Sequence, residues 1–232
     1  MFMLYLISPS NYDLHRDDLD EMYKLRYRVF SKELKWDVKT QDGMEKDEFD
    51  EKNAYYIIAK DKKGIVRGCQ RLIEMTNPCM FDGPFNSFLT SLRDFKYPGY
   101  WEASRFAVDH SYDDTYTLKD AQRLVPTLLA GVMEFGLKVG NVECFLTLSF
   151  PSVAKLASLY GLLVTSLKQN GTGEDALTVS AYPPLNVSYK KLLKKIGYTA
   201  TEPLLCYLNP ELQNTYLFGF HAKQFRTTSQ LT

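Results

Sequence analysis

The pattern of apolar residues changes character near residue 100, and this change limits the fold more than any other feature. Before it, two runs rich in Val, Ile and Tyr, at 55–60 and 65–74, flank the turn-forming sequence Asp-Lys-Lys-Gly and predict an antiparallel hairpin. After it, strand-like runs alternate with segments of helical periodicity. We expect an α/β protein with one mixed, mostly antiparallel sheet sandwiched by helices. The expected strands are 2–7, 55–60, 65–74, 100–108, 142–148, 162–167, 177–181 and 204–208, and the expected helices are 17–31, 118–139, 151–160 and 187–196.

Length and charge limit the class of protein. A chain of 232 residues fits one domain, and its 45% apolar residues supply a sizeable core. The formal net charge is zero, so the chain lacks the basic footprint of a nucleic-acid binder. Because no linker or internal repeat is evident, we expect a single domain.

The cysteines and the N-terminal residues indicate the cellular compartment in which the protein is expected. The four cysteines are scattered, without a CxxC pair or a nearby His cluster, which is typical of reduced thiols rather than of disulfides or a zinc site. The first residues lack the basic region of a signal peptide. No apolar run reaches the roughly 18 residues of a membrane span. We therefore expect a cytoplasmic protein without membrane insertion.

Arg26 lies on the apolar face of the predicted helix 17–31. Met22 precedes it by four residues and Phe30 follows it by four, so the three side chains share one helix face. A guanidinium that is buried there requires a carboxylate partner. The alternative is an arginine at the edge of the core whose charged end reaches solvent.

The segment 36–53 has neither helical nor strand periodicity, and it contains seven acids against three lysines. A structureless stretch of about 18 residues in a compact domain is typical of a lid or a binding loop. Two apolar residues within the acidic run suggest that the segment folds back, so that Asp47 and Asp50 meet an arginine. Arg26 and Arg71 are the candidates, and the alternative is a solvated acidic loop. The run lacks the Asp-x-Asp-x-Asp-Gly spacing of a calcium site.

Arg71 lies within the predicted strand 65–74. Strand alternation places three apolar side chains on its face, namely Ile65, Cys69 and Ile73. A charge on such a face requires a partner, unless the arginine lies at the rim of the sheet.

Glu102 and Arg105 interrupt the aromatic strand-like run 100–108. Because they are three residues apart, a regular strand would send them to opposite faces. Either the two charges serve different sites, or a β-bulge lies between them. Bulges are frequent next to active sites because they redirect side chains and free backbone N–H groups.

The polar and aromatic residues between 20 and 110 follow an ordered pattern. It comprises Arg26-x-x-x-Phe30, Trp36, Glu45-x-Asp47-x-Phe49-Asp50, Gly68-Cys-x-Arg71-Leu and Trp101-Glu-x-Ser-Arg-Phe-Ala-Val108. In order and spacing this pattern resembles the signature of LuxI-type autoinducer synthases, a family of acyl-homoserine lactone synthases. The likeness is dense over 20–110, looser over 111–210, and lapses after that. The resemblance therefore implies one synthase domain over 1–210 followed by a C-terminal extension at 211–232.

The resemblance implies a fold similar to that of the N-acetyltransferases, with a V-shaped gap in the sheet that admits the pantetheine arm of an acyl donor. It also implies functional positions. Those expected to be catalytic are Arg26, Asp47, Asp50, Arg71, Glu102 and Arg105, and those expected to bind substrate are Phe30, Trp36, Ser104, Phe106 and Thr147. A Thr at the last of these positions often accompanies 3-oxo-acyl preference in the family.

The implied activity is synthesis of a quorum-sensing signal. The acyl group of an acyl-carrier protein (or of acyl-CoA) passes to the amine of S-adenosylmethionine, and lactone closure releases N-acyl-homoserine lactone and methylthioadenosine. Glu102, acting through one water, is the expected general base. Backbone N–H groups near Arg105 and Phe106 are the expected oxyanion donors. S-adenosylmethionine is a substrate here, and we expect neither a cofactor nor a metal.

Two rival functions make different predictions. An acyl-CoA N-acyltransferase predicts a glycine-rich pyrophosphate turn before the helix at 118, and that stretch contains no glycine. A non-catalytic sensor would not need Glu102 together with the arginine–aspartate set. Because acyl-carrier protein is acidic, we expect a basic docking face, which could equally be a solvated helix surface. The candidate residues are Lys190, Lys191, Lys194 and Lys195.

Overall fold

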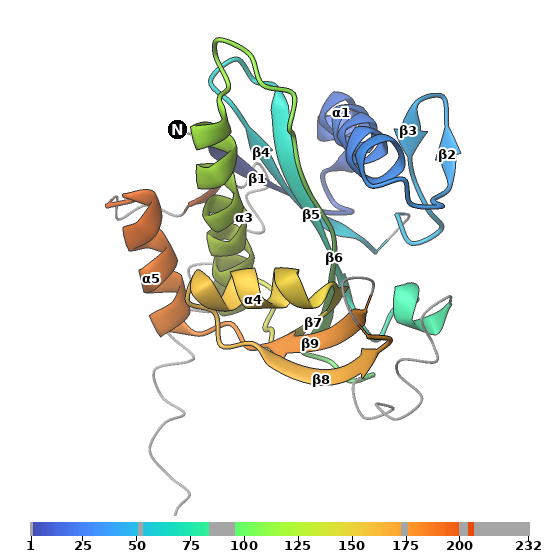
Figure 1. Ribbon diagram of the computed structural model, residues 1–232, viewed down its shortest axis with the longest axis vertical. Coiled ribbons are helices and arrows are strands. Elements are labelled where there is room, and N and C mark those ends of the chain that lie inside the picture. Colours follow the sequence, from blue (N-terminus) through green and yellow to red (C-terminus); the bar gives the residue numbers. More distant parts are fainter. Residues whose placement is uncertain (1, 51–52, 84–95, 173–175, 200–203, 207–232) are drawn as a thin grey trace, which may run out of the picture.

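The computed structural model describes residues 2–50, 53–83, 96–172, 176–199 and 204–206 (Figure 1). Within them lies one sheet of eight strands in the order β10-β1-β4-β5-β6-β7-β9-β8. Its strands are β1 (Met3–Ile7), β4 (Tyr55–Lys60), β5 (Val66–Glu74), β6 (Tyr100–Val108), β7 (Cys144–Ser149), β8 (Thr165–Asn170), β9 (Leu177–Tyr182) and β10 (Leu205–Cys206). Most neighbours are antiparallel, while β1–β10 and β6–β7 are parallel. The predicted mixed sheet is confirmed.

The sheet opens between β6 and β7. These strands pair at three positions only, from Tyr100 opposite Cys144 to Glu102 opposite Leu146. Both strands then continue, β6 to Val108 and β7 to Ser149, without further pairing to each other. The expected V-shaped gap therefore begins immediately after Glu102.

Helices cover both faces of the sheet (Figure 1). They are α1 (Arg16–Arg26), α3 (Leu118–Lys138), α4 (Pro151–Leu159) and α5 (Asn186–Ile196). One apolar core joins α3 and α5 to sheet residues such as Leu72 and Phe145. A second core joins α1 to the opposite side chains of the same strands, such as Ile73 and Leu146. Strand alternation thus feeds both cores, as expected for a sheet with helices on each face.

The predicted helix 17–31 changes its hydrogen bonding at Arg26. The α-helix ends there, and a π-helical segment, η2 (Tyr27–Glu33), continues it. The N–H of Leu34 donates to the carbonyl of Val29, five residues back, at 2.9 Å. Such wider turns are frequent at functional sites. The described residues also contain two short 3₁₀ turns, η1 (Tyr12–His15) and η3 (Met80–Asp82).

The segment 36–53 is more ordered than its sequence predicts. It contains a hairpin of β2 (Thr40–Gln41) and β3 (Met44–Glu45). Asp42 and Gly43 form its turn with φ angles of 51° and 74°. Asp-Gly is a strong signal for such a turn, because both central residues need positive φ. The expectation of a structureless loop was wrong, since two-residue strands are too short to display a period.

Three smaller expectations also change. The strand predicted at 162–167 lies at Thr165–Asn170 instead, because Leu162 packs into the α3 core before the strand begins. Ile65 precedes β5 and is exposed, so it does not share the face of Arg71. The final strand is confirmed at Leu205–Cys206, and 207–208 lie outside the described residues. The predicted extension at 211–232 lies outside them as well.

Candidate active site

A β-bulge redirects the charged residues of β6. Arg71 on β5 pairs with Ser104, whereas Cys69 pairs with Ala107, so Arg105 and Phe106 together oppose a single residue. Arg105 adopts a left-handed φ of 52°, which is rare for a residue with a side chain. The predicted bulge is confirmed, and it places Arg105 on the same side of the sheet as Glu102.

Arg26 is wholly buried at the end of α1 and contacts two acids of the segment 36–53. Its Nε donates to Glu45 at 2.5 Å. Its Nη1 and Nη2 donate to the two carboxylate oxygens of Asp50 at 2.6 and 2.7 Å, a bidentate pair. All three side chains are at most 3% exposed. The alternatives of an arginine at the core edge and of a solvated acidic loop are therefore wrong for these residues.

Arg71 and Arg105 extend the same network across β5 and β6. Nη1 of Arg71 lies 2.5 Å from Asp47 and 3.1 Å from Asp50. Nη2 of Arg105 lies 2.7 Å from Asp47, and its Nε lies 3.0 Å from Glu45. Asp47 and Glu45 thus each bind two arginines. Since Arg71 is fully buried, the alternative of a rim position is wrong.

Glu102 closes the network at the edge of the gap, and its side chain is fully buried. One carboxylate oxygen accepts from the hydroxyl of Ser104 at 2.5 Å, and the other accepts from the backbone N–H of Met80 at 2.8 Å. Nη2 of Arg71 lies 3.5 Å from this carboxylate, and its Nε donates to Ser104 at 3.1 Å. Ser104 therefore links the predicted base to the arginine cluster.

The cluster consists of three arginines and four acids: Arg26, Arg71, Arg105, Glu45, Asp47, Asp50 and Glu102. Four carboxylates against three guanidinium groups leave one formal negative charge in excess. Burial alone would raise the pKa of Asp50, but Arg26 and Arg71 outweigh it and hold that pKa well below its usual range. Burial would lower the pKa of Arg26, but Asp50 and Glu45 hold it well above its usual value. The pair therefore stays ionised although it is buried.

An aromatic pair lies beside the cluster on the α1 face. Phe30 and Trp36 are stacked, with ring centroids 5.2 Å apart and planes at 9°. The guanidinium of Arg105 lies 5.8 Å from the centre of the Phe30 ring. The ring centroid of Trp36 also lies 6.1 Å from that of Phe150, the residue that follows β7. The pair thus spans from the cluster on β6 to the far side of the gap, and Trp36 is 40% exposed.

The structure does not bring every predicted site residue to this cluster. Phe106 is half-buried and packs against the α3 core, on the other face of the sheet. Thr147 follows Leu146, the last β7 residue paired to β6, and strand alternation places it on the α3 face. The docking candidates Lys190, Lys191, Lys194 and Lys195 are exposed on α5, which packs beside α3 away from α1 (Figure 1).

The sequence did not single out three parts of this site. Glu45 lies within a matched motif, and the hairpin signal at Asp42-Gly43 could have fixed its position. Tyr56 on β4 donates its hydroxyl to Asp50 at 2.9 Å. The backbone N–H of Met80 cannot be found from side-chain patterns, because any residue supplies one.

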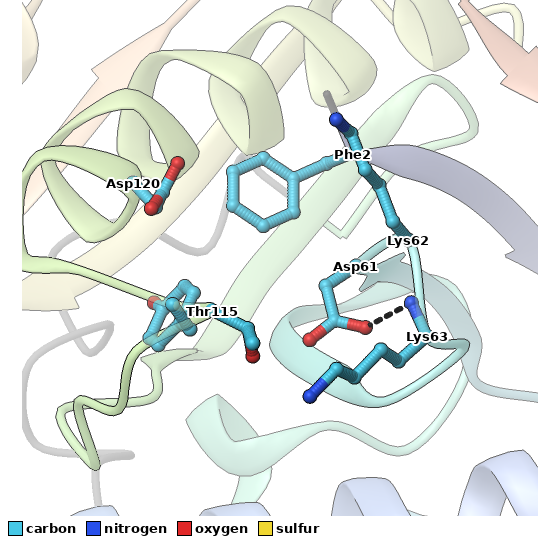
Figure 2. Close-up of a pocket in the computed structure, with 7 residues that line it drawn as sticks. Phe2, Asp61, Lys62, Lys63, Thr115 and Asp120 are labelled. Carbon is cyan, nitrogen blue, oxygen red and sulfur yellow. Dashed lines mark hydrogen bonds between the residues drawn. The ribbon is translucent and has the colours of Figure 1, made fainter.

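A surface pocket of about 330 Å³ lies elsewhere, between the β4–β5 turn and the start of α3 (Figure 2). It is lined by Phe2, Asp61, Lys62, Lys63, Thr115, Tyr116 and Asp120. Its Asp61 accepts the backbone N–H of Lys63 at 2.8 Å. None of the lining residues belongs to the cluster, so the pocket is separate from the candidate active site.

Two further findings concern residues 2–50, 53–83, 96–172, 176–199 and 204–206. Nowhere in these ranges do three or more His, Cys, Asp or Glu side chains form a group that could hold a metal ion. Among the described helices, none combines the length and the apolar character needed to cross a bilayer.

Comparison with known proteins identifies the family. The family model described as "Autoinducer synthase" matches residues 10–177. An acyl-homoserine-lactone synthase of Vibrio anguillarum is 30% identical over 175 residues, which cover 75% of this chain and 89% of that protein. The chain belongs to the autoinducer synthase family. The resemblance drawn from the sequence is thereby confirmed.

Other similar proteins support the assignment of this chain to the autoinducer synthase family. An acyl-homoserine-lactone synthase of Agrobacterium fabrum is 33% identical over 137 residues, or 59% of this chain, and the matched part spans 65% of that relative. The solved structure of BjaI, a CoA-dependent acyl-homoserine lactone synthase with SAM and isopentyl-CoA, has a TM-score of 0.78 and 25% identity. That match covers 95% of this chain and all of BjaI. The expected α/β fold is confirmed.

Proposed function

We propose that the protein synthesises an N-acyl-homoserine lactone, a quorum-sensing signal, from S-adenosylmethionine and a carrier-bound acyl thioester. The observation that carries this proposal is the buried cluster beside the sheet gap. Its excess negative charge and its adjacent glutamate suit a cationic substrate that must lose a proton. Because the proposed substrates are metabolites of the cytoplasm, we propose the cytoplasm as the place of action.

The cluster and the aromatic pair bind S-adenosylmethionine. One excess negative charge in a water-poor site attracts the sulfonium. The exposed ring of Trp36, stacked on Phe30, offers a face to the same cation, a contact of about 1 kcal/mol or more. The similar synthase BjaI was solved with SAM bound, which supports this substrate.

Glu102 is the general base for acyl transfer. The attacking amine must be neutral, and Glu102 accepts its proton through one water as the N–C bond to the thioester carbonyl forms. The bulge at Arg105 and Phe106 leaves the regular ladder, so its backbone N–H groups stabilise the oxyanion. The C–S bond then breaks, and the carrier thiol leaves with a proton.

Lactone closure follows within the acylated intermediate. Its carboxylate attacks its own γ-carbon, a C–O bond forms, and the C–S bond to the sulfonium breaks. Methylthioadenosine leaves as a neutral thioether. This step needs orientation of the carboxylate more than proton transfer. Arg26, Arg71 and Arg105 supply that orientation by holding the site rigid through shared acids.

The acyl donor arrives on acyl-carrier protein, and the four lysines of α5 form its docking face. Their exposure allows an acidic partner to approach. Charge reversal of Lys190 and Lys194 should raise the KM for the carrier-bound donor several-fold, and more at low salt. The KM for S-adenosylmethionine serves as the internal control. An unchanged KM for the carrier-bound donor would exclude this face, and efficient use of acyl-CoA alone would point to a CoA-dependent enzyme.

The decisive experiment combines two readouts. Purified protein is mixed with S-adenosylmethionine and acyl donor, methylthioadenosine release is followed over time, and the lactone is identified by mass spectrometry. We expect both products in equal amounts, and no methylthioadenosine when the donor is omitted. Binding of S-adenosylmethionine without turnover would indicate a sensor instead. An acylated product without methylthioadenosine would indicate an ordinary N-acyltransferase.

A further inference from the structure

Three buried hydroxyl groups lie together on β7 and β9 without a hydrogen-bond partner among the described residues. They belong to Ser149, Thr178 and Ser180. Ser149 pairs with Thr178 across the two strands, and Thr147 pairs with Ser180. Paired residues of neighbouring strands point to the same face of the sheet. The three hydroxyls and that of Thr147 therefore form two adjacent rows: a first row of Thr147 and Ser180, and a second row of Ser149 and Thr178. Thr178 and Ser180 are 2% and 0% exposed.

These rows start where the sheet gap starts. Leu146 is the last β7 residue paired to β6, and Thr147 is the next residue along the strand. The rows continue a pair of stacked aromatic rings, Phe145 and Tyr182, whose centroids are 5.4 Å apart within the α3 core. Leu146 packs in the α1 core, so the hydroxyls face away from Glu102. The point where β6 and β7 part therefore lies between the charged cluster on one face and the hydroxyl rows on the other.

Helix α4 covers this part of the sheet and packs on β9 (Figure 1). It has no buried residue, and its large apolar side chains Val153, Leu156 and Leu159 are exposed. The helix thus packs on the sheet without burying any of its own large apolar side chains. Buried polar atoms are almost always hydrogen-bonded, so a group of three without partners calls for an external one.

We propose that Thr178 and Ser180, with Ser149 opposite, bind an oxygen atom carried on the acyl chain near its carbonyl. This inference rests on the proposed function. Ser and Thr hydroxyls donate to a ketone oxygen and both donate to and accept from a hydroxyl. A strand advances about 3.3 Å per residue, so the first row lies within reach of a substituent on the third carbon of a chain whose carbonyl is beside Glu102.

The acyl chain fits this location better than the pantetheine arm. The arm has to lead back to its carrier through solvent, whereas both β9 hydroxyls are enclosed. The acyl end is the part of the donor that terminates inside the protein. The resemblance to the family pointed to Thr147 alone, and the structure adds β9 as the strand that selects an oxygenated chain.

The test is a competition between donors of equal chain length that carry a 3-oxo group, a 3-hydroxyl group or no substituent. Lactones are quantified by mass spectrometry for the wild type and for the double variant Thr178→Val, Ser180→Ala. We expect the wild type to prefer an oxygenated donor, and the double variant to lose roughly two- to tenfold of that preference for each hydrogen bond removed. The KM for S-adenosylmethionine should not change.

Matched variants separate this role from a loss of structure. Ser166→Ala removes an exposed hydroxyl opposite Ser180 on β8 and should keep the preference. Thr178→Ser keeps the hydroxyl and should also keep the preference for an oxygenated donor. An equal loss with all three donors, or a wild type without preference, overturns the inference while lactone synthesis stands. Absence of lactone from every donor overturns the proposed function itself, and the inference with it.

Discussion

Strand β5 carries two buried arginines four residues apart, and they are used in different ways. Arg67 donates through Nε to Asp61 at 2.8 Å, through Nη1 to Asp109 at 2.8 Å and through Nη2 to Asp113 at 3.3 Å. Its guanidinium also lies 4.4 Å from the ring centre of Tyr116. Every nitrogen of Arg67 is therefore satisfied by the chain itself.

Arg71 is buried to the same degree, at 0% exposure against 4% for Arg67, but it is not fully satisfied. Its Nη2 has no hydrogen bond within the described part of the chain and lies 3.5 Å from the carboxylate of Glu102. Its acids are shared with Arg26 and Arg105, whereas the acids of Arg67 are not shared with a second buried arginine among the described residues. Burial of a charge alone thus does not mark a functional site. What distinguishes Arg71 is an unfilled donor beside the buried carboxylate of Glu102.

The largest effect should come from Glu102→Gln. Because Glu102 is the proposed base, we expect turnover to fall by roughly 10²- to 10⁴-fold, the usual contribution of such a group. Stability should change far less, because Gln retains oxygen and nitrogen atoms in the same volume. Steady-state methylthioadenosine release and urea unfolding measure the two effects separately.

Glu134→Gln is the matched control for this prediction. Glu134 is also fully buried, and it accepts from Tyr189 at 3.0 Å, Lys138 at 2.9 Å and the backbone of Leu205 at 2.8 Å. It holds α5 and β10 against α3 and lies outside the cluster. Its variant should lose stability and keep its turnover. Equal turnover losses in the two variants would show that the loss in Glu102→Gln comes from impaired folding and not from a missing base.

Much of the charged site was predictable because local spacing constrains it. Four-residue spacing put Arg26 on an apolar helix face, and three-residue spacing between Glu102 and Arg105 required either a bulge or two separate sites. The burial of Glu45 was not predictable in the same way, since an acid in an acidic run is normally solvated. Its position depends on the β2–β3 hairpin and on two arginines that are distant in sequence.

The edge strand β8 shows a second limit of sequence patterns. Its residues 165–170 are half-buried or exposed and mostly polar, as befits the last strand of a sheet. Of the apolar run just before it, Leu162 and Val164 pack on the core while Leu163 is exposed, and the run forms no strand. Hydrophobic periodicity therefore located the core residues and missed the strand. The network of Arg67 escaped notice for a similar reason, because its acids lie in two separate connections, Asp61 between β4 and β5, and Asp109 and Asp113 between β6 and α3.

A pair of Arg→Lys variants sharpens the comparison between the two arginines. Arg71→Lys keeps a positive charge but loses the fork that contacts Asp47 and Ser104 and holds the proposed site rigid, so we expect kcat/KM to fall by about 100-fold. Arg67→Lys should lower the free energy of unfolding by about 1–3 kcal/mol through lost hydrogen bonds, and leave kcat/KM within about threefold. Steady-state kinetics and urea titration of both variants give the answer. The comparison breaks down if Arg67→Lys loses activity as Arg71→Lys does.

The smallest effect concerns acid stability. The arginines lower the pKa of Asp50 in the folded protein, so the unfolded chain binds more protons below about pH 4, its ordinary range. The free energy of unfolding should thus be at its full value above about pH 5 and decline as the pH falls further. Asp50→Asn should flatten this decline by up to about 1.4 kcal/mol per pH unit.

Asp109, in the network of Arg67, tests whether acid stability and activity separate. Burial would raise its pKa, but hydrogen bonds from Ser111 and Arg67 lower it. Asp109→Asn should therefore also flatten the decline in the free energy of unfolding as the pH falls. Only Asp50→Asn should also reduce kcat/KM at pH 7, because Asp50 alone contacts both Arg26 and Arg71. Urea unfolding between pH 3 and 6, together with kinetics at pH 7, measures both properties. If the free energy of unfolding of both variants declined with falling pH as steeply as that of the wild type, neither carboxylate would be held ionised by its arginine. The electrostatic account of both networks would then be wrong.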